Sequence, residues 1–436
     1  MKELLLLVVM TSLSSCILAD SPIQVTLEKS QDSSWQVTYQ SDKPVKYLSF
    51  VRNPNDARVA RWTPKNKAFQ IVRENDIEII RRFDKKTFSK ITIGLQSSYI
   101  HLPKDYAPFS PFSDGGILIY TGRFFACPNQ CKESYNQWEF HVVANENENI
   151  IINGLIYKRN ASWLDQDSGS NIYVGNQTPI ATSHVIAVID KGLPNEIKTS
   201  LSSFLPELMD FYGQYLNKPT TKPSLFASYG ENTGSSYGRQ GGTFSSQIFM
   251  HWYGSNLNKL VKQPDYLHEI VWFFAHEAAH FHQDQLFDER DAWIHEGGAE
   301  FMASDALIKK WPERQPLLDK KFGEAHSVCI NGLTSMSLQQ ASKKGRYDLH
   351  YSCGLLISNA IHKAVMSKNK TSNGIYSVQK TYKRLVDDGD KVGLSTYLKS
   401  IKQYTSEPFI TEIRELVTSV HLIETLANNP LLEFSN

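Results

Sequence analysis

The sequence predicts a mixed α+β protein that begins with an antiparallel β domain and ends in helices, and two patterns carry this prediction. From about Ile23 to Ala181, apolar and polar residues alternate in short runs between turn signals such as Asp114-Gly115-Gly116, which is typical of half-buried strands. From Asp265 to the end, apolar residues recur at helical spacing.

The stretch between these regions mixes both patterns. After Pro194 apolar residues recur at helical spacing and predict a helix that ends near Gly213 to Asn217. Ser224 to Tyr229 and Gln247 to Met250 are then predicted as two strands, and the glycine-rich stretch Gly230 to Gly242 connects them.

The composition excludes several classes of protein. The chain has 436 residues, and its 46 basic and 45 acidic side chains give a formal charge of +1, so we expect no nucleic-acid partner. With 41% hydrophobic residues the chain can bury a large core, which argues against disorder. No apolar run reaches about 18 residues, so we expect no membrane-spanning helix in the mature protein.

The N-terminus has the features of an export signal. A short apolar run from Leu4 to Met10 precedes small polar residues. Leu13-Ser14-Ser15-Cys16 then resembles the lipobox of bacterial lipoproteins, in which the cysteine is acylated and becomes the mature N-terminus. Residues 1–15 are therefore predicted to be a lipoprotein signal peptide, with Cys16 as a lipid anchor that holds the protein in the bacterial cell envelope. Cleavage near Ala19 is the alternative, and either route exports the protein.

Export changes the expected state of the other cysteines, because exported proteins can form disulfides. We expect the local pairs Cys127 with Cys131 and Cys329 with Cys353, since the partners of each pair are neighbours in the sequence. A zinc ribbon is the competing interpretation of Cys-x-x-x-Cys, but the second pair is too widely separated for ribbon spacing.

The segment His276-Glu277-Ala278-Ala279-His280 carries a metal-binding pattern. Histidines four residues apart project from one helical face, so both imidazoles can bind a single Zn²⁺. Glu277 is placed to act as the general base toward a water activated by zinc. A catalytic zinc site of this kind needs a third protein ligand.

Fifteen residues separate His280 from Glu296, which lies within Trp293-Ile294-His295-Glu296-Gly297-Gly298-Ala299. Here the sequence resembles the gluzincin clan of zinc peptidases, most closely the membrane alanyl aminopeptidase family, whose ligand glutamate lies in a Trp-Leu-Asn-Glu-Gly-Phe-Ala type segment. The resemblance implies one zinc ion held by His276, His280 and Glu296 in a thermolysin-like domain. Glu300, one turn further on, is expected to hydrogen-bond a ligand histidine, or to be the ligand itself.

The family also supplies a tyrosine that stabilises the oxyanion, in a Tyr-x-Lys-Gly segment. Tyr351-Ser352-Cys353-Gly354 matches this pattern except at the lysine, so the resemblance implies this role for Tyr351. Tyr347 and His350 are the alternatives. A Cys329–Cys353 disulfide would hold the helix that presents Tyr351. Helix geometry is expected to direct His282 and His295 away from the ligand face, as packing or surface histidines.

One family feature is missing. The aminopeptidases bind the free amine of their substrates with the glutamate of a Gly-x-Met-Glu-Asn segment, whereas Gly241 to Ser246 contains no carboxylate. An ammonium group without a partner is costly to bury. We therefore expect a zinc metallopeptidase acting on peptides or proteins that is not a strict aminopeptidase. The alternatives are a zinc hydrolase of a non-peptide amide or ester, and a non-catalytic envelope-binding lipoprotein.

These assignments predict four parts of the chain. The signal peptide of residues 1–15 precedes a β-rich domain of residues 16–182. A catalytic domain with the zinc-binding helix follows over residues 183–310, and a helical domain over residues 311–436.

Overall fold

The computed structural model describes residues 23–102, 105–132, 135–183, 185–216, 218–219, 221–230, 236–244, 246–284, 286–368 and 373–433. The predicted signal peptide and Cys16 lie outside these residues. The fold is mixed α+β, with sheets first and helices last, which confirms the predicted class. The chain forms two compact units. The units are defined by contacts between residues and do not test the domain boundaries predicted from the sequence. The boundaries at residues 15, 182 and 310 therefore stay predictions.

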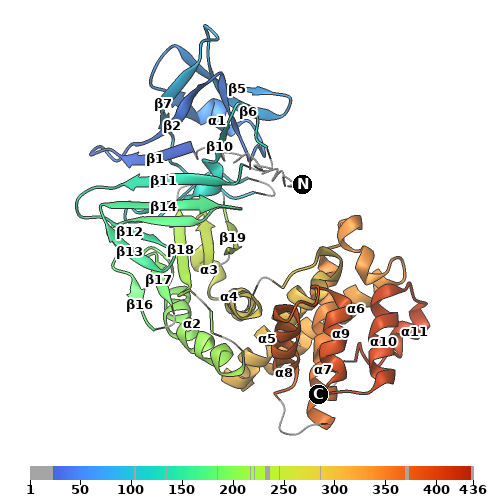
Figure 1. Ribbon diagram of the computed structural model, residues 1–436. Helices are drawn as coiled ribbons and strands as arrows, with labels where there is room; N and C mark the ends of the chain where they lie inside the picture. The colour runs from blue at the N-terminus through green and yellow to red at the C-terminus, as the bar shows by residue number, and fades with distance from the viewer. Residues whose placement is uncertain are drawn as a thin grey trace, which may run out of the picture. The chain divides into compact units, whose positions relative to one another are not determined.

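The first unit comprises the described residues up to 96, together with parts of 124–143 and residues 162–167, and contains two sheets (Figure 1). The six-stranded sheet has the order β14-β11-β1-β2-β7-β4, and the four-stranded sheet has the order β10-β3-β6-β5. The elements are β1 Ile23–Lys29, β2 Trp35–Val45, β3 Tyr47–Phe50, α1 Ala57–Arg61, β4 Trp62–Pro64, β5 Phe69–Glu74, β6 Ile77–Arg82, β7 Phe88–Leu95, β10 Ala126–Pro128, β11 Gln137–Val143 and β14 Asn160–Gln166.

Burial in this unit follows the alternation seen in the sequence. Every second residue of β1 is buried, because successive side chains of a strand point to opposite faces. Most neighbouring strands are antiparallel, as predicted, but β1 pairs with β11 in parallel. Alternation cannot reveal this pairing, because it joins segments more than a hundred residues apart.

The second unit contains residues 97–123, 144–161 and those from 168 onward, and it begins with two five-stranded sheets. The first is antiparallel, with the order β13-β12-β15-β9-β8, and the second has the order β16-β17-β18-β20-β19. In the second sheet β17, β18 and β20 run parallel. The strands are β8 Phe109–Pro111, β9 Ile117–Tyr120, β12 Asn149–Ile152, β13 Leu155–Lys158, β15 Asn171–Gly175, β16 Ile180–Ala181, β17 Ile186–Ile189, β18 Ser224–Gly230, β19 Gly238–Phe244 and β20 Gln247–Tyr253.

Strand β19 forms where the sequence suggests only a glycine-rich connection. It pairs antiparallel with β20 at the end of the sheet, and its other edge has no strand partner among the described residues. Glycine is needed at the start of this strand, because a Cβ on Gly238 would lie 2.1 Å from the ring of Tyr253. The small side chains that weaken strand propensity therefore allow this close pairing.

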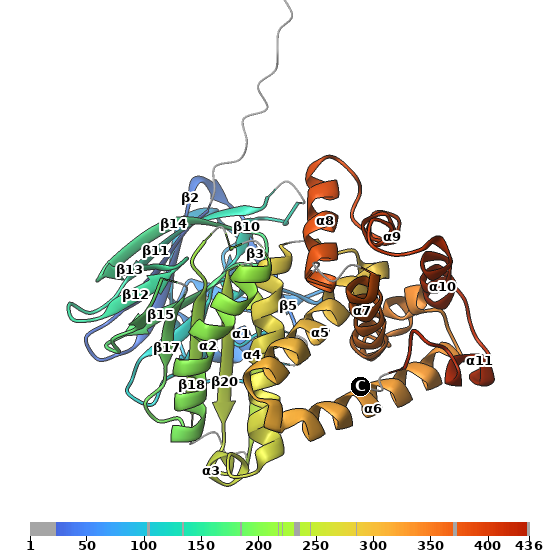
Figure 2. The ribbon, with the colours of Figure 1, turned by 90° about the horizontal axis from the view of Figure 1, so that it is seen from below.

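Helices make up the rest of the second unit (Figure 2). Helices α2 and α4 pack against each other and contact the parallel sheet through β17 and β20. One hydrophobic core extends from Val185 to Leu432. None of the described helices is both long and apolar enough to cross a bilayer. The helices are α2 Asn195–Tyr215, α3 Leu257–Leu260, α4 Pro264–Gln283, α5 Ala292–Lys310, α6 Gln315–Leu333, α7 Asp348–Lys368, α8 Ile375–Asp387, α9 Leu394–Lys402, α10 Glu407–Thr418 and α11 Ile423–Ala427.

Helices α5 and α7 cross with their backbones in contact. A Cβ on Gly297 of α5 would lie 2.1 Å from the Cα of Gly354, and a Cβ on Gly354 would lie 2.6 Å from the Cα of Gly297. No side chain fits at this crossing. The glycine pair therefore sets the distance between two helices that carry predicted site residues, Glu296 on α5 and Tyr351 on α7.

We predict that Gly354→Ala lowers the free energy of unfolding by about 1–3 kcal/mol, because the added methyl overpacks the crossing. Gly213→Ala is the matched control, since its Cβ would meet only the Lys218 side chain, at 3.7 Å. In α2 this second change is expected to stabilise the protein by up to about 1 kcal/mol through helix propensity. Urea unfolding of both variants measures the two changes in the free energy of unfolding. Equal changes would contradict the close backbone contact of α5 with α7.

Candidate metal centre and active site

Three side chains from two helices converge on one point. His276 and His280 lie one turn apart on α4, and their Nε2 atoms are 3.0 Å apart. Glu296 reaches them from the first turns of α5, with its Oε2 3.3 Å from Nε2 of His276 and 3.4 Å from Nε2 of His280. Their ligand atoms all lie within 4.8 Å of one another. Two imidazole nitrogens and a carboxylate oxygen form a donor set that fits a catalytic zinc ion.

Glu300 lies on the opposite side of the His276 ring. Its Oε1 is 3.3 Å from Nδ1 of His276, and its Oε2 accepts a hydrogen bond of 2.7 Å from the Trp272 indole. The carboxylate therefore faces the nitrogen that points away from the convergence point. This position suits the supporting role expected for Glu300 and leaves the ligand position to Glu296.

The charges of this cluster are strongly coupled. Burial opposes protonation of His276, but the carboxylates of Glu296 and Glu300 outweigh it and raise the pKa of His276 to about 10. Burial likewise opposes ionisation of Glu296, but its contacts with His276, His280 and His295 hold its pKa well below the ordinary value. The raised pKa of His276 favours a protonated imidazole between the two carboxylates at neutral pH.

Tyr351 stands beside the first histidine. Its ring stacks on that of His276 with the centroids 5.6 Å apart, and 38% of the residue is exposed. Burial of the phenol and the charge of Glu296 raise its pKa well above the ordinary value, so the hydroxyl stays protonated and can donate a hydrogen bond. Of the alternatives, Tyr347 is 56% exposed, whereas His350 is buried with its Nε2 2.8 Å from Oγ of Ser342.

The prediction that His295 points away from the ligands is wrong. Its ring lies parallel to that of His280 with the centroids 4.1 Å apart, and its Nδ1 is 3.7 Å from Oε1 of Glu296. Burial, aided by the neighbouring His280, lowers the pKa of His295 to about 4. Helical spacing within α5 could not reveal this contact, because the partner ring belongs to α4.

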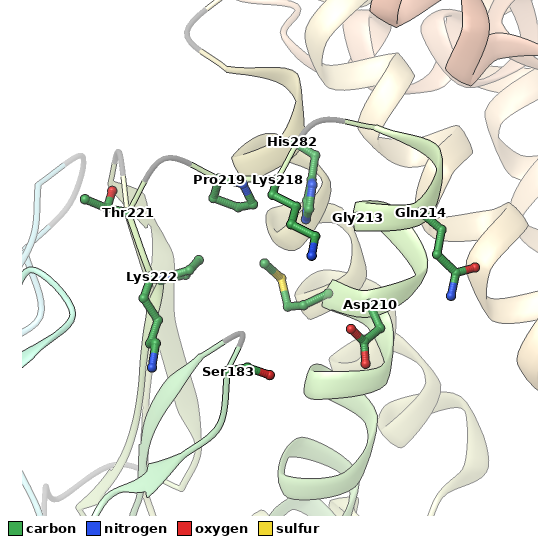
Figure 3. A pocket seen from close by; sticks show the side chains of 11 residues that line it. Ser183, Asp210, Gly213, Gln214, Lys218, Pro219, Thr221, Lys222 and His282 are labelled. Atoms are coloured by element: carbon green, nitrogen blue, oxygen red, sulfur yellow. The ribbon is translucent and has the colours of Figure 1, made fainter.

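His282 agrees with the prediction of a packing histidine. It is 4% exposed, and its ring lies 5.6 Å from that of Tyr212 on α2. It lines a cavity together with Asp210, Lys218 and Lys222, among other residues (Figure 3). The side chain is therefore directed toward α2 and not toward the convergence point.

Both locally paired disulfides expected from the sequence are present. Cys127–Cys131 lies in the first unit, and Cys329–Cys353 joins α6 to α7 in the second. Cys353 follows Tyr351 by two residues, so the second disulfide fixes the first turns of the helix that presents the tyrosine.

No protein-family model matches the sequence, and no curated protein matches it either. Solved structures nevertheless share its architecture. An aminopeptidase N family protein from Idiomarina loihiensis has a TM-score of 0.64 at 10% identity, over 92% of this chain and 76% of that one. An M1 zinc metallopeptidase from Deinococcus radiodurans, a mutant bound to a Tyr-Ser-Ala substrate, has a TM-score of 0.51 at 12% identity, over 92% and 94%. Yeast LTA4 hydrolase has a TM-score of 0.52 at 10% identity, over 94% and 70%.

This chain has the fold of the M1 zinc aminopeptidases. The fold implied by the resemblance in the sequence is thus confirmed, although identity is low.

Within this M1-like fold, β19 runs beside the helix that carries the histidines. Thr243 donates a hydrogen bond of 2.5 Å to Oε2 of Glu277, and Arg239 lies 3.5 Å from Glu269 on the same helix.

Sequence reasoning missed two residues that contact this cluster. Thr243 lies in the stretch Gly241 to Ser246, where the family has a glutamate and this sequence has no carboxylate. That difference from the family was a signal that could have identified Thr243. Gln283, which contacts His280, follows the second histidine by three residues on the same helix. That spacing is a usable signal, because residues three apart lie on one helical face.

We predict that metal binding to the cluster of His276, His280 and Glu296 releases a proton at pH 7. The raised pKa of His276, about 10, means that its imidazole is protonated at neutral pH and must become neutral to bind a metal. Apparent Zn²⁺ affinity should rise about tenfold per pH unit from pH 7 toward 10. Calorimetry of the metal-free protein in buffers with different ionisation enthalpies measures the release.

Glu300→Gln is the control for this measurement, because removing one of the two carboxylates lowers the pKa of His276. The pH at which proton release disappears should then move downward. Zinc binding without proton release at pH 7 would contradict the charge state described for the wild type.

Proposed function

We propose that the protein is a zinc-dependent metallopeptidase that hydrolyses peptide bonds. The observation that carries this proposal is the convergence of His276, His280 and Glu296, with Glu277 on the same helix as the histidines. A set of two histidines and one glutamate leaves a zinc position open for chemistry, unlike the closed sets of structural zinc sites. The M1-like fold supports zinc as the metal.

In this proposal each residue of the chain has one task. His276, His280 and Glu296 hold the zinc ion, which when bound lowers the pKa of water and polarises a carbonyl. Glu277 accepts the proton of the attacking water and passes it to the leaving amine. Thr243 orients the Glu277 carboxylate through Oε2. The Tyr351 hydroxyl donates a hydrogen bond to the oxygen of the scissile carbonyl as negative charge develops there.

We propose that the substrate is a peptide that needs no free N-terminus. The edge of β19 that has no strand partner among the described residues is suited to bind an extended peptide by backbone hydrogen bonds. Residues Gly241 to Ser246 offer no carboxylate that could pair with an ammonium group. The tripeptide bound by the Deinococcus radiodurans enzyme supports a peptide as the ligand of this fold.

We also propose that the protein is exported and anchored through an acylated Cys16. The sequence motif is the basis of this proposal, and the two disulfides support it, because disulfides persist in oxidising compartments.

Glu277→Gln is expected to lower the rate of peptide hydrolysis by about 10²–10⁴-fold, because the amide cannot take up the proton of the attacking water. Zinc content, measured by mass spectrometry, should not change, since Glu277 is not a ligand. His276→Ala provides the contrasting control and should lose both zinc and activity. A Glu277→Gln variant as active as the wild type would reject the mechanism.

Two peptides of one sequence, one with a free and one with an acetylated N-terminus, test the proposed substrate class. A charged hydrogen bond to the amine contributes about 1.5–3 kcal/mol, so an enzyme that uses one loses at least about tenfold in kcat/KM on acetylation. We expect a smaller loss here. Cleavage of the free peptide alone would identify a strict aminopeptidase and contradict the proposal.

A further inference from the structure

Gln283 connects the two helices that carry the convergent ligands. It is the last residue of α4 and is only 4% exposed. Its Oε1 lies 2.8 Å from Nδ1 of His280, and its Nε2 donates a hydrogen bond of 3.0 Å to the backbone carbonyl of His295, the residue before Glu296. One buried amide therefore contacts the histidine from α4 and the backbone of α5 beside the glutamate.

The partners of this amide determine that Nδ1 of the His280 ring carries a hydrogen. The His295 carbonyl can only accept a hydrogen bond, so the NH₂ group of Gln283 must face it and the amide oxygen must face His280. That oxygen is also only an acceptor, so Nδ1 of His280 must carry a proton. The lone pair on Nε2 of His280 is then free to face the metal position, beside Nε2 of His276 and Oε2 of Glu296.

The surroundings are shaped to hold the amide in place. A Cβ on Gly298 would lie 2.9 Å from Nε2 of Gln283 and 3.2 Å from Nε2 of Gln379, so a side chain there would press on both amides. Gln379 comes from α8 and is 5% exposed. Lys383 of the same helix lies 3.3 Å from the carboxylate of Asp284, the residue after Gln283. Helix α8 therefore packs behind the end of α4.

The two histidines are supported by side chains of different charge. Nδ1 of His276 faces the carboxylate of Glu300, whereas Nδ1 of His280 faces a neutral amide. Glu296 already brings a further carboxylate to the convergence point, 3.4 Å from Nε2 of His280. A neutral acceptor at residue 283 orients His280 without adding another negative charge to a buried site.

The geometry points to Gln283 as a positioning residue that holds the Nδ1–H form of His280 and fixes the backbone of α5 next to Glu296. For the metal itself this inference rests on the proposed zinc-dependent function, but the hydrogen bond to His280 exists without it. Partners of metal-binding histidines typically contribute about 10- to 100-fold to metal affinity or activity. The inference also gives α8, which carries no predicted site residue, a role in supporting the site.

Gln283→Met tests the inference, because methionine has a similar length but neither donates nor accepts these hydrogen bonds. Zn²⁺ affinity, measured by competition with a chelator, should fall about 10- to 100-fold. In metal-free full-length protein with ¹⁵N-labelled histidine, the slowly exchanging Nδ1–H signal of His280 should be present in the wild type and lost in Gln283→Met. The His280→Gln variant assigns that signal.

Gln263→Met is the matched control, because Gln263 is exposed just before the start of the same helix. It should change neither the zinc affinity nor the His280 signal. Thermal unfolding of the metal-free variants distinguishes the positioning role from a merely structural one. A merely structural role would lower the melting temperature of Gln283→Met and leave the His280 signal in place. A Gln283→Met protein that keeps both the signal and wild-type zinc affinity overturns the inference.

Gln283→Glu tests the two contacts of the amide separately, because it should keep the one with His280 and lose the one with His295. A carboxylate still accepts from Nδ1 of His280 but cannot donate to the His295 carbonyl. The His280 signal should therefore persist in this variant, and its loss overturns the inference even if Gln283→Met does not fold. A wild type that binds no zinc would reject the proposed function, whereas the His280 signal would still decide the role of Gln283.

Discussion

The close approach of α5 to its neighbours is the constraint on which the candidate site depends. Glu296 reaches the two histidines only because α5 begins against the end of α4 and crosses α7 with backbone in contact. Consecutive glycines make this possible, since Gly297 admits α7 and Gly298 leaves room for the Gln283 amide. A side chain at residue 297 would push α5 away from α7 and so move the Glu296 carboxylate relative to the imidazoles, and catalytic groups tolerate displacements of only about 0.5 Å.

Buried charge is the second constraint, and it is balanced within the cluster. Glu296 and Glu300 face opposite nitrogens of His276, and together they raise its pKa. The two carboxylates that stabilise the proton on His276 can also stabilise a divalent cation. Neutral groups at the same positions would offer a buried cation no such compensation. Burial, aided by the charge of Glu296, raises the pKa of the nearby Tyr351 phenol, which preserves its ability to donate a hydrogen bond.

The edge strand distinguishes this chain from the aminopeptidases whose fold it has. Gly241 to Ser246 occupies the segment where the resemblance implies an amine-binding glutamate, and within this stretch Thr243 donates a hydrogen bond to Glu277 of α4. In the proposed mechanism the hydrogen bond from Thr243 orients Glu277 as the general base, while Gly241 to Ser246 offers no carboxylate for an amine. We propose that the edge of β19 without a strand partner among the described residues pairs with the substrate backbone, and such an edge selects extended chains more than chain ends.

The sequence by itself determined what depends on neighbouring residues. The alternation of β1, the face shared by His276 and His280, and the disulfides between cysteines close in sequence all follow from local geometry. Glu296 and Tyr351 required a family resemblance as well, because their distance in sequence carries no geometric information. Only the tertiary structure decided the parallel pairing of β1 with β11, the strand at Gly238–Phe244, the stacking of His295 on His280 and the bridge made by Gln283. Each of these joins separate segments, and their approach is set by packing and by the absence of a Cβ at particular glycines, which no periodicity along the chain encodes.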